Sequence, residues 1–251
     1  HTNMRHYSLY LFLILGVISL FTSCKKEKKE YTYSICLIVD GTDAQVNQNA
    51  VPHISLSEIE KLMDSLSILG YGSLYLTYVD ENSANNAVAE WSWYQKPPKD
   101  VELKTGDGSS ELQKKTKEHY TNQKEYWKAQ EEARAAFSLK VDSVLSLAYA
   151  KEVTRKSKGS DVYGAVNKAL SYVVADEGAN ISLILLVSDL EHNTKNRELL
   201  QIPKRTKLFA VGTSLDSNSD LKPTKEFATF DQVIRYIPSQ DFLNTCLEKQ
   251  K

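Results

Sequence analysis

Four apolar runs constrain the fold of this chain more than any other feature of its sequence. They cover residues 33–39 (YSICLIV), 73–79 (SLYLTYV), 181–187 (ISLILLV) and 207–212 (KLFAVG). The runs at 33–39 and 181–187 have almost no polar alternation, which is typical of strands that are buried on both faces. We therefore expect a sheet that other elements cover on both sides.

Helical patterns separate these runs. Ser55 and Glu58 match a capping box, and residues 56–69 then follow an amphipathic pattern that Gly70 ends. Residues 161–175 (DVYGAVNKALSYVVA) predict a second helix. Strands that alternate with helices predict an α/β fold, here a doubly wound, mostly parallel sheet flanked by helices.

Three shorter patterns complete this domain, which we expect to span residues 31–251. Residues 88–94 (VAEWSWY) alternate as an edge strand does. Residues 232–237 (QVIRYI) predict a last strand, and Ser239 is placed to cap a closing helix.

Residues 95–158 differ in character and predict a helical insertion. Pro97, Pro98 and the stretch 105–108 are loop signals, and a polar segment rich in Glu, Lys, Gln and Ala follows. A straight helix over 109–152 would be about 66 Å long, so we expect a break or a protrusion. The apolar positions that recur at helical spacing are Ala133, Phe137, Val141, Val144 and Ala148.

Trp91, Trp93 and Tyr94 form an aromatic cluster just before the insertion. One interpretation is that the cluster packs an edge strand against the inserted helix. The alternative is a platform that binds a sugar or a protein.

The N-terminal segment carries an export pattern. Arg5 and His6 form a short basic region, residues 7–21 are predominantly apolar, and Thr-Ser-Cys follows, with the cysteine at position 24. This apolar stretch is shorter than the roughly 20 residues that span a bilayer. The small residues before Cys24 resemble the lipobox of bacterial lipoproteins, although Phe21 is not the usual residue there.

This resemblance implies that residues 1–23 are a lipoprotein signal segment and that Cys24 is acylated. Residues 24–30 then form a charged tether. The domain would be attached to the membrane in the cell envelope, at the outer membrane on its periplasmic face or at the cell surface. An uncleaved membrane anchor is the alternative for the apolar stretch.

Charge and cysteine content exclude several classes. The formal net charge is −1, which gives nucleic-acid binding no electrostatic support. After Cys24 only Cys36 and Cys246 remain, too few for a disulfide framework. The sequence has no CxxC, no HExxH and no glycine-rich phosphate loop.

Three polar clusters stand at predicted strand ends or helix starts. They are Asp40-Gly41-Thr42, Gly159-Ser160-Asp161 and Ser188-Asp189. Ligands of such sheets bind at the carboxyl ends of the strands, near the point where strand order reverses. Carboxylates and hydroxyls that converge there predict a site for a hard cation such as Mg²⁺, with Mn²⁺ as a substitute.

Structural roles compete at each position. Ser160 can cap the following helix, with Asp161 in its first turn. Asp189 can cap a short helix, and Asp40 with Gly41 can form a plain turn.

The clusters resemble the metal-ion-dependent adhesion site of von Willebrand factor A (VWA) domains, which has a DxSxS motif, a later Thr and a final Asp. Asp40 and Thr42 match the first and third motif positions, Ser160 stands for the Thr, and Asp189 stands for the final Asp. The resemblance covers residues 33–94 and 159–250, and the segment DVYGAVNKAL is similar to the helix that follows the Thr.

The resemblance implies that Thr42 and Ser160 bind the metal directly. Asp40 and Asp189 would hold it directly or through water, and an acidic group of a partner would complete the shell. Two residues depart from the family pattern. Ala44 replaces the second serine, and Leu190 stands where a glycine is usual.

The leading hypothesis is a lipid-anchored, non-enzymatic module that binds a protein partner. The alternative is a structural component of an envelope assembly that uses the insertion and has a degenerate, metal-free site. A phosphatase-like hydrolase is less favoured, because Thr42 and Ala44 replace the second Asp and the Thr or Val of the DxDx[TV] motif.

Glu191 and His192 follow Asp189 directly, and they either extend the predicted site or are solvated.

Overall fold

The computed structural model describes one compact unit that begins at Tyr31. It describes residues 31–248 except for 42–50, 94–107, 151–158, 177, 191–193, 195–197 and 213–219. The predicted signal segment 1–23, Cys24 and the tether therefore lie outside the described residues.

A six-stranded sheet forms the centre of the unit, in the order β3-β2-β1-β4-β5-β6. Its strands are β1 (Thr32–Asp40), β2 (Tyr71–Val79), β3 (Ala89–Trp93), β4 (Ile181–Val187), β5 (Thr206–Val211) and β6 (Lys225–Phe227). All pairs are parallel except β2 with β3. The predicted α/β fold with a mostly parallel sheet is thus confirmed, including the edge strand at β3.

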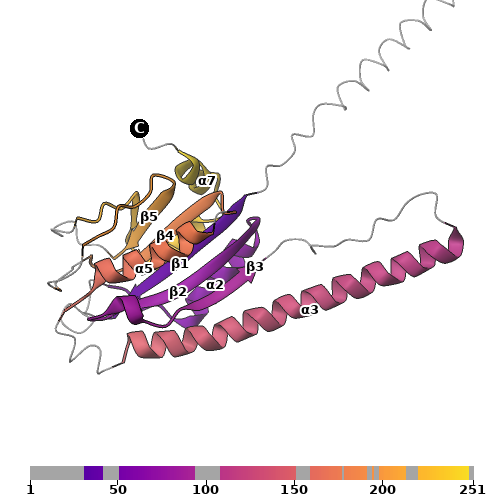
Figure 1. The fold of residues 1–251 in the computed structure, drawn as a ribbon, viewed down its shortest axis with the longest axis horizontal. Coiled ribbons are helices and arrows are strands. Elements are labelled where there is room, and N and C mark those ends of the chain that lie inside the picture. The colour runs from indigo at the N-terminus through magenta and orange to yellow at the C-terminus, as the bar shows by residue number, and fades with distance from the viewer. Residues whose placement is uncertain are drawn as a thin grey trace, which may run out of the picture. The chain divides into compact units, whose positions relative to one another are not determined.

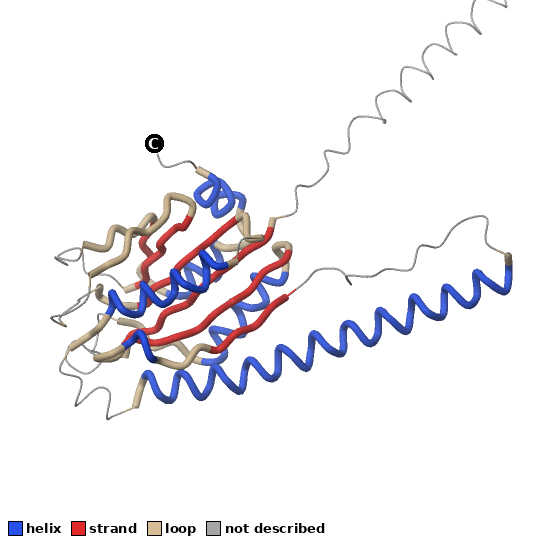
Figure 2. Tube along the Cα trace, in the orientation of Figure 1, coloured by secondary structure: helices blue, strands red, loops and turns tan. Residues whose placement is uncertain are grey.

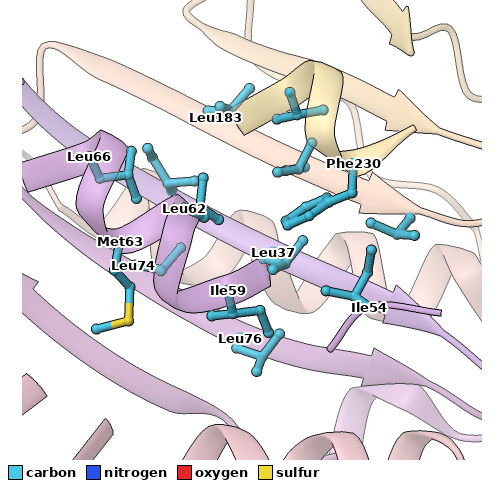
Figure 3. Packing of buried hydrophobic residues seen from close by; sticks show 14 of the residues in the cluster. Leu37, Ile54, Ile59, Leu62, Met63, Leu66, Leu74, Leu76, Leu183 and Phe230 are labelled. Carbon is cyan, nitrogen blue, oxygen red and sulfur yellow. The ribbon is translucent and has the colours of Figure 1, made fainter. Parts of the chain in front are cut away.

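Helices cover both faces of this sheet (Figures 1 and 2). One face packs against α2 (Leu56–Ser67), α3 (Ser109–Ala148), α6 (Phe230–Tyr236) and α7 (Gln240–Leu247), whose buried side chains share a cluster with alternate strand residues. Figure 3 shows part of this core, where α2 meets β1 and β2. The other face packs against α5 (Val162–Ala175). A short 3₁₀ helix, η1 (Ser83–Asn85), follows β2.

Helix starts follow the sequence closely. The predicted capping box is present, because Ser55 accepts from the Glu58 N–H while the Glu58 carboxylate accepts from the Ser55 N–H. Ser239 caps α7 as expected. The end of α2 was predicted wrongly, since Ile68 is its C-cap and Gly70 lies beyond it. A Cβ at Gly70 would lie 2.2 Å from the Tyr31 carbonyl oxygen, so this glycine permits close packing.

The last strand was placed wrongly. Residues 232–237 lie mostly in α6, which Thr229 caps, and the sixth strand is β6. The side chains of Phe230, Val233, Ile234 and Ile237 are buried, and they follow helical spacing from the first turn onward. The six-residue window alone was too short to separate helix from strand.

The described part of the insertion, residues 108–150, is dominated by one long helix. α3 has 40 residues without a break, which corresponds to about 60 Å. It packs on the sheet only near its C-terminal end, through Phe137, Val141, Val144, Leu145 and Ala148, and its N-terminal half extends past β3 (Figure 1). Of the two predicted outcomes, the protrusion is the one observed.

The two tryptophans of the aromatic cluster pack β3 against this helix, whereas Tyr94 lies outside the described residues. The Trp91 ring lies 6.2 Å from the Phe137 ring and 5.2 Å from the Trp93 ring. Both tryptophans are buried. This contact agrees with the packing interpretation rather than with an open binding platform.

Candidate functional site

The carboxyl ends of β1 and β4 meet at the middle of the sheet. Val39 pairs with Val187 in the β1–β4 register, so Asp40 and Ser188 come next to each other as the strands end. β1 is followed by α2 on one face, whereas β4 is preceded by α5 on the other. The β1–β4 boundary is therefore the point where strand order reverses, which is where ligands of such sheets bind.

Ser188 fixes the Asp40 carboxylate at this point. Its hydroxyl donates to Asp40 Oδ2 at 2.7 Å and accepts from the Leu190 N–H at 3.0 Å. Asp40, Ser188 and Asp189 are all buried, with relative exposures of 3%, 0% and 6%. One small side chain thus links the end of β1 to the turn that follows β4.

The turn after β4 has an unusual backbone. Leu190 has φ 65°, and among the described residues it is the one non-glycine residue with positive φ. This left-handed conformation costs an L-residue roughly 1–2 kcal/mol. The Leu190 side chain is 2% exposed and belongs to the core cluster on the α5 face, and its burial offsets that cost.

The loop before α5 is tied to the end of β2. The Asp161 N–H donates to the Asp80 carbonyl at 2.8 Å. The Asp161 carboxylate accepts from the Ser83 N–H at 3.1 Å and from the Gly164 N–H at 2.9 Å. Asp161 is therefore the N-cap of α5, which corrects the expectation that Ser160 caps the helix and Asp161 lies in its first turn.

Three of the four predicted ligands thus lie at one edge of the sheet. Asp40 ends β1, Asp189 follows β4, and Ser160 adjoins the loop that is bound to the end of β2; Ser160 is 1% exposed. Thr42 lies outside the described residues, as do Ala44, Glu191 and His192.

The end of α3 also reaches this edge, which the sequence did not predict. A Cβ at Gly41 would lie 2.1 Å from the Ala148 carbonyl oxygen, so the segment after β1 runs directly against the helix end. The glycine next to Asp40 was the available signal, because glycine often marks a close approach of backbones.

Tyr149, the C-cap of α3, extends this contact. Its hydroxyl accepts from the Ile54 N–H at 2.9 Å, and its ring stacks on His53 at 4.3 Å. Burial raises the pKa of the Tyr149 phenol to about 12, and the charges of Asp40 and Glu58 act in the same direction. The insertion and the strand end therefore share one buried junction.

The chemistry available here is that of oxygen ligands. Carboxylates and hydroxyls suit a hard cation such as Mg²⁺, which also retains bound waters. Within the described ranges, no group of three or more His, Cys, Asp or Glu side chains is arranged to hold a metal ion. A cation at this edge would thus combine two carboxylates with hydroxyl oxygens, and this donor set fits Mg²⁺ and Mn²⁺.

Comparison of the chain with protein-family models, with curated proteins and with solved structures finds no match. In the part of the chain that the structure describes, no helix is long and apolar enough to cross a membrane. A proposal for the function therefore depends on the geometry of the strand ends and on the sequence resemblance to VWA domains.

Proposed function

We propose that this protein is a lipid-anchored module of the cell envelope that binds a protein partner through a divalent cation. Asp40, Thr42, Ser160 and Asp189 would hold Mg²⁺, or Mn²⁺ in its place, and a carboxylate of the partner would complete the shell. Cys24 would carry the lipid, at the periplasmic face of the outer membrane or at the cell surface.

The observation that carries this proposal is the buried contact between Asp40 and Ser188 at the β1–β4 boundary. The contact holds an acidic side chain in one orientation at the position where sheets of this topology bind ligands. A second acidic side chain, Asp189, follows directly after Ser188. Two acidic residues on neighbouring strand ends, with the Asp40 carboxylate held by Ser188, offer a start for a cation site.

The backbone of Leu190 supports the family resemblance. A glycine is usual at this position in VWA domains, and glycine adopts positive φ without the steric cost that other residues bear. Position 190 carries leucine in place of that glycine, yet its backbone adopts a positive φ. The turn after Asp189 thus has a backbone that a glycine at position 190 would also adopt without steric strain.

Calorimetry tests the cation directly. Residues 31–251 would be titrated with Mg²⁺ and Mn²⁺, with thermal melts in the presence and absence of chelator. Saturable binding that disappears in Asp40→Asn and Asp189→Asn, but persists in the exposed control Asp142→Asn, supports the proposal. A ligand that binds only the native state stabilises it by about 2.7 kcal/mol at a hundredfold excess over Kd. No heat and no shift at millimolar metal would contradict it.

One alternative is a structural component of an envelope assembly with a metal-free site. It is favoured by the hydrogen bond from Ser188, which gives the Asp40 carboxylate a partner without a metal, and by the exposed half of α3. Deletion of the N-terminal half of α3 separates the two functions. Loss of an envelope partner with unchanged Mg²⁺ binding would favour this alternative.

A phosphatase-like activity is the least favoured function. Its test is a phosphatase screen of the wild-type protein beside Asp40→Asn. Turnover that Asp40→Asn abolishes would replace the binding proposal.

A further inference from the structure

The exposed half of α3 contains an internal repeat. Residues 117–123 (KEHYTNQ) and 124–130 (KEYWKAQ) share Lys, Glu and Gln at equivalent places, and each unit has two ring-bearing residues after the Lys-Glu pair. A seven-residue step along a helix advances about 10.5 Å and returns to nearly the same side. Equivalent side chains are therefore presented twice along one line of the surface.

One face of the helix, the α3 seam, combines the repeated lysines and aromatic rings. Its members follow one another in alternating steps of four and three residues, the spacing of a coiled-coil contact. All of its members are exposed, including Tyr120 at 68% and Trp127 at 46%. The α3 seam consists of Gln113, Lys117, Tyr120, Lys124, Trp127 and Glu131.

Neighbouring side chains on α3 orient the two rings. His119 contacts the Tyr120 ring edge-on at 5.5 Å, and Tyr126 contacts the Trp127 ring at 5.1 Å. The indole N–H of Trp127 donates to Gln123 at 3.2 Å. The rings are thus held on the helix surface, which lowers the entropic cost of their use in an interface.

We propose that the α3 seam binds the α3 seam of a second copy of this chain, with the helices antiparallel. A two-fold axis makes such a contact self-complementary, because each residue meets its counterpart in both directions. In the register centred on residue 122, Lys117 faces the partner's Trp127, and Tyr120 faces the partner's Lys124. Gln113 then faces the partner's Glu131.

The chemistry of these pairs selects this arrangement. Each ring meets an ammonium group, which gives four cation–π contacts per dimer. The carboxamide of Gln113 can donate to the carboxylate of Glu131. A parallel, in-register pair would instead bring Lys117 and Lys124 against their own copies, and like charges oppose association. Aromatic rings and lysines in alternation therefore favour the antiparallel pair.

The interface lies on the part of α3 that extends past the sheet, so it is independent of the proposed cation site. Its affinity is limited by the lysines, because a charged residue in a helix seam fixes register at a cost in stability. Two copies joined in this way would carry two lipid anchors, and membrane attachment would gain from avidity.

Sedimentation equilibrium tests the association, with residues 31–251, which include all described strands and helices. We expect a concentration-dependent dimer that Trp127→Ala and Lys117→Glu each weaken about tenfold or more. The matched control is Leu139→Ala, because Leu139 is 75% exposed on the same helix but lies off the α3 seam. A monomer at all concentrations, or an equal loss in Leu139→Ala, would overturn the proposal.

Disulfide trapping tests the orientation. The double variant Gln113→Cys/Glu131→Cys should form a cross-linked dimer under mild oxidation, while Gln113→Cys alone should not. The native Cys36 and Cys246 are buried and stay out of the reaction. Cross-linking of the single variant would show parallel helices and overturn the antiparallel register.

Discussion

The Ser188 hydroxyl donates a 2.7 Å hydrogen bond to the Asp40 carboxylate across the boundary between β4 and β1. Both residues are buried, and the same hydroxyl accepts from the Leu190 backbone. A strand end and a turn that are 148 positions apart in the sequence are thereby held by one oxygen atom. The contact therefore fixes the position of Asp40, the acidic residue on which the proposed function depends.

Ser188→Ala should lower the free energy of unfolding by about 1–3 kcal/mol, because it removes a partner of a buried carboxylate. Urea unfolding measures the change. The matched control is Ser143→Ala, an exposed α3 serine that bonds only to Leu139 of its own helix, and its effect should stay within about 0.5 kcal/mol. Equal effects in the two variants would mean that the contact with Asp40 contributes little.

At Leu190 we expect a glycine substitution to destabilise the protein less than an alanine substitution, which reverses the usual order. Leu190→Ala loses buried apolar contacts and keeps the left-handed backbone strain, whereas Leu190→Gly loses the contacts and relieves the strain. We expect Ala to cost about 2–5 kcal/mol and Gly to cost about 1 kcal/mol less than Ala. Thermal and urea unfolding of both variants check this. If the glycine variant were less stable than the alanine variant, the backbone at position 190 would not be strained as we infer.

Periodicity over long segments is what allowed the fold to be predicted. The β4 run coincides with its predicted bounds, and the capping box correctly marked the start of α2. The short segment 232–237 was predicted as a strand but is helical, because the helical phase of its apolar residues is set by Phe230, which precedes the segment. A local sequence pattern was therefore enough to predict an element that was long or that carried its own capping residue.

The site was predictable only in part, because its decisive contacts join distant residues. The sequence placed Asp40 and Asp189 at strand ends and Ser160 directly before a helix, and carboxyl ends of parallel strands share one edge. It did not predict that Asp161 caps α5 while it binds the Ser83 N–H, or that Ser188 bonds to Asp40. These partners depend on register between strands, which no local pattern encodes.

Gly41→Ala should disrupt the junction between α3 and the end of β1. The added Cβ would lie 2.1 Å from the Ala148 carbonyl oxygen, so one backbone must move. We expect a loss of about 1–3 kcal/mol and faster amide exchange in the last turn of α3. Gly178→Ala is the control, because its Cβ would meet Asp176 at an ordinary 3.5 Å. Unchanged exchange near Ala148 would contradict the junction.

Tyr149 should make the same junction sensitive to alkaline pH. Its pKa is raised from 10.0 to about 12 in the folded protein, chiefly by burial. The folded state therefore disfavours the tyrosinate. The stability that this group contributes is fully present below pH 10 and is lost as the pH rises from 10 to 12.

The test is unfolding of the wild-type protein and Tyr149→Phe from pH 7 to 12. At pH 7 the variant should be less stable by about 1–3 kcal/mol, because the Ile54 N–H loses its acceptor. The difference should narrow above pH 10, since phenylalanine does not ionise. The control Ser143→Ala, which removes an exposed and non-ionising hydroxyl from α3, should follow the wild-type curve throughout. Parallel curves for the wild-type protein and Tyr149→Phe up to pH 12 would show that Tyr149 does not ionise with the expected linkage to folding.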